Sequence, residues 1–165
     1  MVGNEGEAAT EPARQPVQVL VHPLRLVGWD WEFLLLRRLP SRGGFWQGVT
    51  GGVEGQESLA DAARRELIEE TRLQPIVLQS IDHSCSYPMD EGLRQSHPEV
   101  NEIEEHVFFA QVDGGSDPLI DPEEHDRFIW CRLEEAIELL HWPENKDALT
   151  RVEEHLRRHR ARHER

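Results

Sequence analysis

Three glutamates within residues 65–70 are spaced so that their carboxylates can act on one ligand. Glu66, Glu69 and Glu70 stand at i, i+3 and i+4, positions that project from one face of a helix. Such a face repels itself unless cations neutralise it, and clustered carboxylate oxygens are ligands that Mg²⁺ takes in proteins. A solvated acidic stripe is the alternative interpretation in a chain with 32 acidic residues. The residues on the N-terminal side of the glutamates favour the metal-binding interpretation.

These glutamates belong to a longer pattern of fixed spacing. It runs Gly51, five residues, Glu57, seven residues, Arg65-Glu66-Leu67, one residue, Glu69-Glu70, two residues and Leu73. The pattern resembles the Nudix box, Gly-x5-Glu-x7-Arg-Glu-U-x-Glu-Glu-x-Gly-U, in which U is aliphatic. Six of its seven glycine or polar positions and both aliphatic positions are met. The motif is therefore specific, and its structural context is the test of it.

One fixed position of the box departs from the pattern, because Arg72 replaces glycine. Glycine there lets the chain turn through a left-handed conformation after a helix, which costs a residue with a side chain about 1 kcal/mol. We expect the arginine to be accommodated if the chain leaves the helix without a positive φ. Since that glycine contributes no chemistry, the substitution bears on the turn and not on catalysis.

The Nudix family cleaves nucleoside diphosphates linked to another moiety, with divalent metals held by the box carboxylates on an α/β/α sandwich. The resemblance therefore implies an α/β fold, a Nudix sandwich with a mixed sheet. It also implies Mg²⁺ as the cofactor, with Mn²⁺ as an alternative, and Glu66 and Glu70 as direct ligands. Mg²⁺ would neutralise the polyanionic substrate and activate a water.

The same resemblance implies roles for the other residues of the box. Glu69 would support the carboxylate cluster, and the carbonyl of Gly51 would complete a coordination sphere. Arg65 would orient a carboxylate, for example by bidentate pairing with Glu57.

The segment that enters the box, residues 45–54, is similar to that of dihydroneopterin triphosphate pyrophosphatases, also described as dATP pyrophosphohydrolases. Thr50 stands where many other Nudix branches have proline. Two outer groups extend the resemblance over most of residues 14–150: Glu124-His125 with Trp130, and Trp142 with Asn145. Residues 83–100 have no counterpart in this branch.

A carboxylate outside the box is implied as well. In this branch a glutamate beyond the box contributes to the metal site, and the matching position is Glu124. Glu104 and Glu105 are alternatives, and the neighbouring Glu123 shows how easily the alignment shifts by one residue. A loop acid that is merely solvated is the other interpretation of Glu124.

Several residues align with positions that contact substrate in the related enzymes. They include Arg14, Arg37 and Thr50, and the guanidinium of arginine suits phosphate oxygens by its geometry. Structural roles are equally compatible with Arg37 and Thr50. Trp46 would stack on a purine or pterin, with a place in the core as the alternative. Asn145 offers a donor and an acceptor to a heterocycle edge, or forms the turn before the last helix.

The resemblance predicts a Mg²⁺-dependent pyrophosphohydrolase that cleaves a (deoxy)nucleoside triphosphate or dihydroneopterin triphosphate to monophosphate and pyrophosphate. A dinucleoside polyphosphate hydrolase is the nearest enzymatic alternative. A Nudix module that senses a nucleotide without turnover is the alternative from another class. The intact Glu66, Glu69 and Glu70 argue against the sensor, which does not need a full metal cluster.

Composition limits the partners and the compartment. A length of 165 residues fits one domain, and a formal charge of −14 argues against a nucleic-acid backbone as the main partner. A small charged substrate is compatible, since metal ions invert the sign of an acidic site. Cys85 and Cys131 have no Cys-x-x-Cys spacing, so we expect buried free thiols. No stretch suits a signal peptide or a membrane span, so we expect no membrane partner and a cytoplasmic protein; the oligomeric state stays open.

Periodicity places the box among regular elements. Helices are expected from Ser58 as N-cap through the box, at residues 133–140 and at residues 146–158; strands are expected at residues 17–21, 32–38, 76–81, 106–112 and 127–132. We expect a disordered tail at residues 1–13, the Nudix domain at residues 14–158 and a frayed basic C-terminus at residues 159–165. The arginines of the last 15 residues fit a helix end that complements the dipole, with a phosphate-binding or nucleic-acid-binding arm as the alternative.

Overall fold

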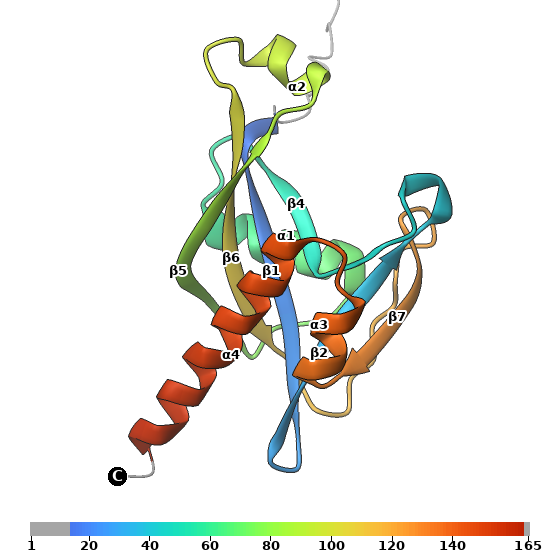
Figure 1. Ribbon diagram of the computed structural model, residues 1–165, viewed down its shortest axis with the longest axis vertical. Coiled ribbons are helices and arrows are strands. Elements are labelled where there is room, and N and C mark those ends of the chain that lie inside the picture. The colour runs from blue at the N-terminus through green and yellow to red at the C-terminus, as the bar shows by residue number, and fades with distance from the viewer. Residues whose placement is uncertain (1–13, 164–165) are drawn as a thin grey trace, which may run out of the picture.

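The computed structural model describes residues 14–163 as one sheet with helices on both faces (Figure 1). Its elements in chain order are β1 (Arg14–Val27), β2 (Asp30–Arg38), the 3₁₀ turn η1 (Pro40–Arg42), β3 (Trp46–Gln47), β4 (Val49–Glu54), α1 (Leu59–Thr71), β5 (Val77–Pro88), α2 (Glu91–Ser96), β6 (Glu102–Gln111), β7 (His125–Cys131), α3 (Leu133–Leu139) and α4 (Pro143–His163). The predicted tail at residues 1–13 lies outside the described residues.

The sheet is mixed, as predicted. Its strand order is β3-β2-β1-β6-β5, with β4 also paired to β1 and β7 to β2. The β1–β6 pair is parallel and places Gln18 opposite Glu105, whereas β1 and β4 are antiparallel and place Val19 opposite Gly51. The first residue of the box is thereby fixed to the central strand.

Alternate side chains of β1 contribute to two apolar layers, one on each face of the sheet. Val19 and Val21 pack in the cluster that contains Leu67 of α1, whereas Leu20 and Leu24 pack with α4. Successive side chains of a strand point to opposite faces, so α1 covers one face while α3 and α4 cover the other (Figure 1). The predicted α/β/α sandwich is confirmed. Among residues 14–163, no helix has both the length and the apolar character needed to cross a bilayer.

The helix that carries the box begins and ends at defined caps. The side-chain oxygen of Ser58 accepts the N–H of Asp61 at 3.1 Å, which confirms the predicted N-cap. At the other end Arg72 has φ 59°, and its N–H donates to the carbonyl of Ile68 at 2.9 Å. The chain therefore does not leave the helix without a positive φ, which was the condition considered for accommodating an arginine. Arg72 adopts the left-handed conformation of the glycine that it replaces.

Replacing Arg72 by glycine is expected to raise the free energy of unfolding by about 1 kcal/mol, because glycine adopts this conformation without a Cβ clash. Urea denaturation measures the change. Arg72→Ala is the control, since it removes the side chain but keeps the Cβ, and it should not stabilise the protein. Equal stabilisation by both variants would contradict the backbone explanation.

The chain departs from the predicted elements in several further places: β3, β4 and α2 were not predicted, and β1, β5 and α4 are longer than predicted. β5 continues to Pro88, beyond the predicted strand end at residue 81, and Asp82 with φ 53° marks an irregularity where the β5–β6 register shifts. The extension joins α2 as an arm with its own small apolar cluster, at the top of Figure 1. α4 starts at Pro143, which suits the first turn of a helix, and continues to His163, five residues past the predicted end.

Candidate active site

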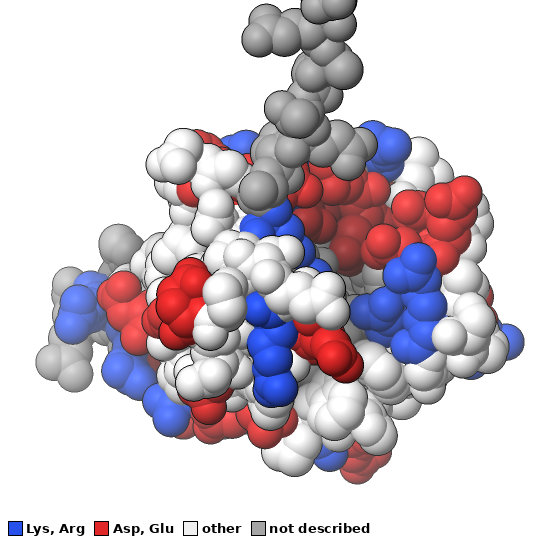
Figure 2. All heavy atoms as spheres, turned by 90° about the horizontal axis from the view of Figure 1, so that it is seen from above, with Lys and Arg blue, Asp and Glu red and all other residues white. Residues whose placement is uncertain are grey.

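A cavity of about 560 Å³ opens beside the helix that carries the box. Acidic side chains gather in a recess bordered by basic ones on the face shown in Figure 2. The lining residues from β4 and α1 are Thr50, Gly51, Gly52, Glu54, Glu66 and Glu70. The others are Arg14, Gln18, Arg38, Gln47, Tyr87, Glu105, Glu124, Trp142, Glu144 and Asn145.

Glu66 and Glu70 enter the cavity from α1, and both are largely buried. A Cβ added to Gly51 would lie 1.9 Å from Cδ of Glu66, so only glycine lets this carboxylate approach β4. Glu70 is 6% exposed, and its Oε2 has no hydrogen-bond partner among the described residues. An unpaired buried carboxylate oxygen is costly, and its place in the cavity wall suits a ligand atom for a cation.

Arg65 joins the parts of the box. Its guanidinium pairs with Glu57 through two bonds, Nε to Oε2 at 3.1 Å and Nη2 to Oε1 at 2.7 Å, which is the predicted bidentate geometry. It also donates to the carbonyl of Gly52 at 2.8 Å, to Glu66 at 2.8 Å and to Glu69 at 3.3 Å. Arg65 is thus a positioning residue that fixes the Glu66 carboxylate against β4.

The loop before β7 brings a third acid to the cavity. The carbonyl of Asp121 accepts the N–H groups of Glu124 at 3.1 Å and His125 at 2.9 Å, and the N–H of Leu39 donates to the carbonyl of Glu124 at 3.0 Å. Ligand atoms of Glu70, Glu124 and His125 all lie within 4.8 Å of one another. The sequence-based prediction placed Glu124 here but gave His125 no role.

The two alternatives to Glu124 lie elsewhere. Glu104 is exposed, and Oε1 of its carboxylate lies 3.2 Å from Nε2 of His106. Glu105 lines the cavity, but its carboxylate accepts hydrogen bonds from Gln18 and Tyr87. The geometry therefore favours Glu124 as the acid that joins Glu70.

Burial and mutual repulsion raise the affinity of the acids for protons. Burial raises the pKa of Glu70 to about 9, and the charges of Glu124 and Glu66 add to the rise. Burial also raises the pKa of Glu66 to about 7, against the lowering effect of Arg65. Burial lowers the pKa of His125 to about 4, so its ring is neutral at pH 7. Carboxylates held together at this cost, beside a neutral imidazole, are a donor set that fits a divalent cation.

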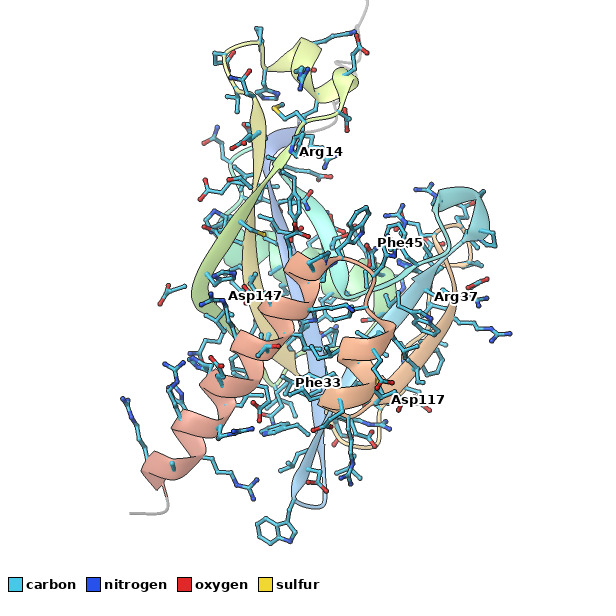
Figure 3. All side chains as sticks on the ribbon, in the orientation of Figure 1. Arg14, Phe33, Arg37, Phe45, Asp117 and Asp147 are labelled. Carbon is cyan, nitrogen blue, oxygen red and sulfur yellow. The ribbon has the colours of Figure 1, made fainter. Side chains whose placement is uncertain are left out.

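Two adjacent arginines take opposite places. Arg37 does not line the cavity, and its guanidinium makes two 2.8 Å bonds to Asp126 of β7; Figure 3 shows it beside that strand, apart from Arg14. Arg38 lines the cavity instead, and its charge lowers the pKa of Glu70. The alternation of β2 explains the difference, because Arg38 follows Leu36 on the face that packs against α1.

The remaining predicted residues divide into two groups. Arg14, Thr50 and Asn145 line the cavity, and Asn145 also starts α4, since its N–H donates to the carbonyl of Trp142 at 3.1 Å. Trp46 packs against the apolar cluster beneath α4, which is the alternative place considered for it. Glu69 is 56% exposed and does not line the cavity, so its contact with the site runs through Arg65. Both thiols are free as expected, and Cys131 is buried as expected, but Cys85 is partly exposed, so the predicted burial is wrong for Cys85.

Comparison with known proteins shows which family this chain matches. A family model described as the NUDIX domain matches residues 26–152. An octanoyltransferase of Myxococcus xanthus is 40% identical over 113 residues, which cover 68% of this chain and 30% of that protein. A dihydroneopterin triphosphate diphosphatase of Haemophilus influenzae is 30% identical over 119 residues, which cover 69% of this chain and 74% of that protein. The chain thus spans less than a third of the Myxococcus protein but most of the Haemophilus one.

A solved structure agrees with these matches. The structure of a Listeria monocytogenes protein assigned as a NUDIX hydrolase superposes with a TM-score of 0.74 and 32% sequence identity. The superposition covers 88% of this chain and 97% of that one. The two chains therefore share a fold over most of their lengths.

Proposed function

This chain belongs to the Nudix family of hydrolases, and from that premise we propose that it cleaves a (deoxy)nucleoside triphosphate or dihydroneopterin triphosphate to monophosphate and pyrophosphate. The observation that carries the proposal is the convergence of Glu66, Glu70 and Glu124 in one cavity with Arg14 and Arg38. Acids for a cation and guanidinium groups for phosphate oxygens thus face the same space. The similarity to the Haemophilus diphosphatase supports the choice of a triphosphate.

In this proposal Glu66, Glu70 and Glu124 would hold Mg²⁺, and the carbonyl of Gly51 and the ring of His125 would be further candidate donors among the residues of the site. Bound there, Mg²⁺ would supply charge neutralisation at the phosphates and lower the pKa of a water. The protein side of the site is preorganised, since Arg65 fixes Glu66 before any ligand arrives.

The reaction adds water across the α–β phosphoanhydride bond, and the chain's own residues serve each part of it. Arg14 and Arg38 bind phosphate oxygens and hold the polyphosphate against α1. The carboxylate of Glu124, on a turn fixed through Leu39, takes the proton of the attacking water. Thr50 lines the same cavity and offers a hydroxyl to the phosphate oxygens.

The products test the reaction. Purified protein with Mg²⁺ is incubated with dATP, dGTP, dihydroneopterin triphosphate or diadenosine tetraphosphate, and the products are separated without added pyrophosphatase. We expect monophosphate and pyrophosphate in equal amounts and no accumulating diphosphate. Intact triphosphates beside conversion of diadenosine tetraphosphate to ATP and AMP would replace the proposal with a dinucleoside polyphosphate hydrolase. Binding without any turnover would indicate a sensor.

Metal binding is expected to release protons. At pH 7 the metal-free protein holds a proton on Glu70, whose pKa is about 9, and in part on Glu66, whose pKa is about 7. Metal ligation requires both carboxylates deprotonated, so we expect release of about 1.5 protons per Mg²⁺ at pH 7 and an affinity that rises from pH 6 to pH 9. Calorimetry in buffers of different ionisation enthalpy measures the released protons. A proton count of zero, or an affinity independent of pH, would contradict this account of the cluster.

A further inference from the structure

One side of the cavity takes no part in holding the phosphates. Its wall is formed by Tyr87 and Glu105 from the paired strands β5 and β6 and by Trp142, Glu144 and Asn145 at the start of α4. The box acids instead come from α1, on the opposite face of the sheet. A substrate whose phosphates contact the box therefore presents its other end to this second wall.

Glu105 is the centre of the second wall. It is 2% exposed, yet it lines the cavity. Gln18 donates from Nε2 to one carboxylate oxygen, and the hydroxyl of Tyr87 donates to the other at 2.9 Å. Burial raises the pKa of Glu105, and both hydrogen bonds oppose that rise. The thiol of Cys85 lies 3.9 Å from the oxygen that Tyr87 contacts, but its single proton has a nearer acceptor in the Tyr87 hydroxyl, at 3.3 Å. Since a carboxylate oxygen accepts two hydrogen bonds, each oxygen then keeps one acceptor position.

The residues around Glu105 suit a flat heterocycle. Trp142 is 44% exposed, and edge contacts with Phe45 at 5.5 Å and His141 at 4.6 Å between ring centroids fix its orientation. Asn145 is 4% exposed and brings an amide to the same wall. An aromatic ring for stacking, an amide, and a buried acceptor pair are the usual elements of a base-recognition site.

We propose that Glu105 reads the edge of a 2-amino-4-oxopyrimidine ring, the ring shared by guanine and pterin. This inference rests on the proposed function and names the part of the substrate that the function leaves open. The ring N–H and the exocyclic amino group of that edge are adjacent donors, and they match the two carboxylate oxygens. Adenine offers one donor beside a ring-nitrogen acceptor, which would face an acceptor and stay unpaired. A site that hydrogen-bonds a polar edge of its substrate rejects analogues that leave the polar groups of the site unpaired.

Glu105→Gln tests the proposal, because it keeps the shape and replaces one acceptor with a donor. With Mg²⁺, we expect kcat/KM for dGTP and dihydroneopterin triphosphate to fall 10- to 100-fold, mainly through KM, and kcat/KM for dATP to change less than about 3-fold. Glu104→Gln is the matched control, since Glu104 is exposed on the same strand and should leave all three substrates unchanged. Comparison of dGTP with the pterin in the wild-type enzyme distinguishes the two sources of the ring.

A second variant shows whether Glu105→Gln acts only by disrupting the buried hydrogen bonds around residue 105. Tyr87→Phe removes one donor to Glu105 while the carboxylate remains, and we expect a smaller loss, about 3- to 10-fold, again confined to the two oxo substrates. An equal loss for dATP and dGTP in both variants, or a wild-type enzyme that prefers dATP, would overturn the inference and leave the proposed function intact.

Failure of the proposed function would give a different result from failure of this inference. If the wild-type protein hydrolyses no triphosphate, calorimetry with dGMP and dAMP still tests the edge. Tighter binding of dGMP that Glu105→Gln abolishes would support the assignment of Glu105 without turnover. Equal binding of the two monophosphates would overturn it.

Discussion

Replacing Glu70 by glutamine is expected to lower kcat at least about 100-fold while the fold remains intact. The amide keeps the shape of the side chain but removes the charge that a divalent cation requires. Within residues 14–163, Oε2 of Glu70 has no hydrogen-bond partner, so in the proposed site a cation would be its partner. Turnover is measured with saturating triphosphate over a range of Mg²⁺ concentrations. The required concentration of Mg²⁺ should rise as kcat falls.

Measuring the unfolding temperature distinguishes this loss of kcat from loss of the folded structure. Burial raises the pKa of Glu70 from an ordinary value of 4.5 to about 9. Between these two pH values the folded metal-free protein binds more protons than the unfolded chain, so its stability falls as pH rises. Glutamine removes that dependence. In EDTA at pH 8, Glu70→Gln should therefore unfold at a temperature no lower than that of the wild-type protein.

Added Mg²⁺ should then reverse the order. The wild-type protein gains stability from the bound ion, and the Glu70→Gln protein gains less because its site lacks one charge. Glu123→Gln is the matched control, since this acid is exposed beside Glu124 and should change neither kcat nor the response to Mg²⁺. Near-normal turnover of Glu70→Gln at saturating Mg²⁺ would remove Glu70 from the set of ligands.

The sequence contains the box and most of its local geometry. Helical spacing places Glu66 and Glu70 together, the Ser58 cap starts the helix where predicted, and Arg65 pairs with Glu57. These features are fixed by residues at most 13 positions apart from one another, so local patterns contain them. The departure at Arg72 was visible too, but whether φ would be positive depended on how the chain leaves α1.

The sequence indicated Asn145 of the second wall, but it did not indicate how Glu105 and Tyr87 meet there. Gln18 meets Glu105 only because β1 and β6 are parallel neighbours, and the two residues are 87 positions apart. The strand that carries Tyr87 was predicted to end at residue 81, but in the structure it continues past an irregularity at Asp82 through residues that alternate between exposed and half-buried. Long-range pairing, which leaves no local periodicity, decides this part of the site.

The arginines at the end of β2 show the same limit on a smaller scale. Alignment selected Arg37 as the phosphate ligand, but strand alternation turns Arg37 toward Asp126 and Arg38 into the cavity. A shift of one residue in a strand moves a side chain to the other face. Because positions 37 and 38 are both arginine, residue type alone could not show which side chain faces the acids.

Arg38→Ala is therefore expected to lower kcat/KM by about 30- to 100-fold, since it removes a guanidinium that neutralises phosphate charge in a partly buried site. Its charge also lowers the pKa of Glu70, so the variant should need a higher pH to reach its maximal rate. Arg37→Ala is the matched control and should change kcat/KM less than about 3-fold, because Arg37 pairs with Asp126 outside the cavity. Steady-state kinetics across pH 6 to 9 on both variants gives the two readouts. A large loss of activity in Arg37→Ala, with normal activity in Arg38→Ala, would make Arg37 the phosphate ligand, as the alignment indicated. It would mean that the end of β2 rotates when substrate binds, so that the two side chains exchange faces.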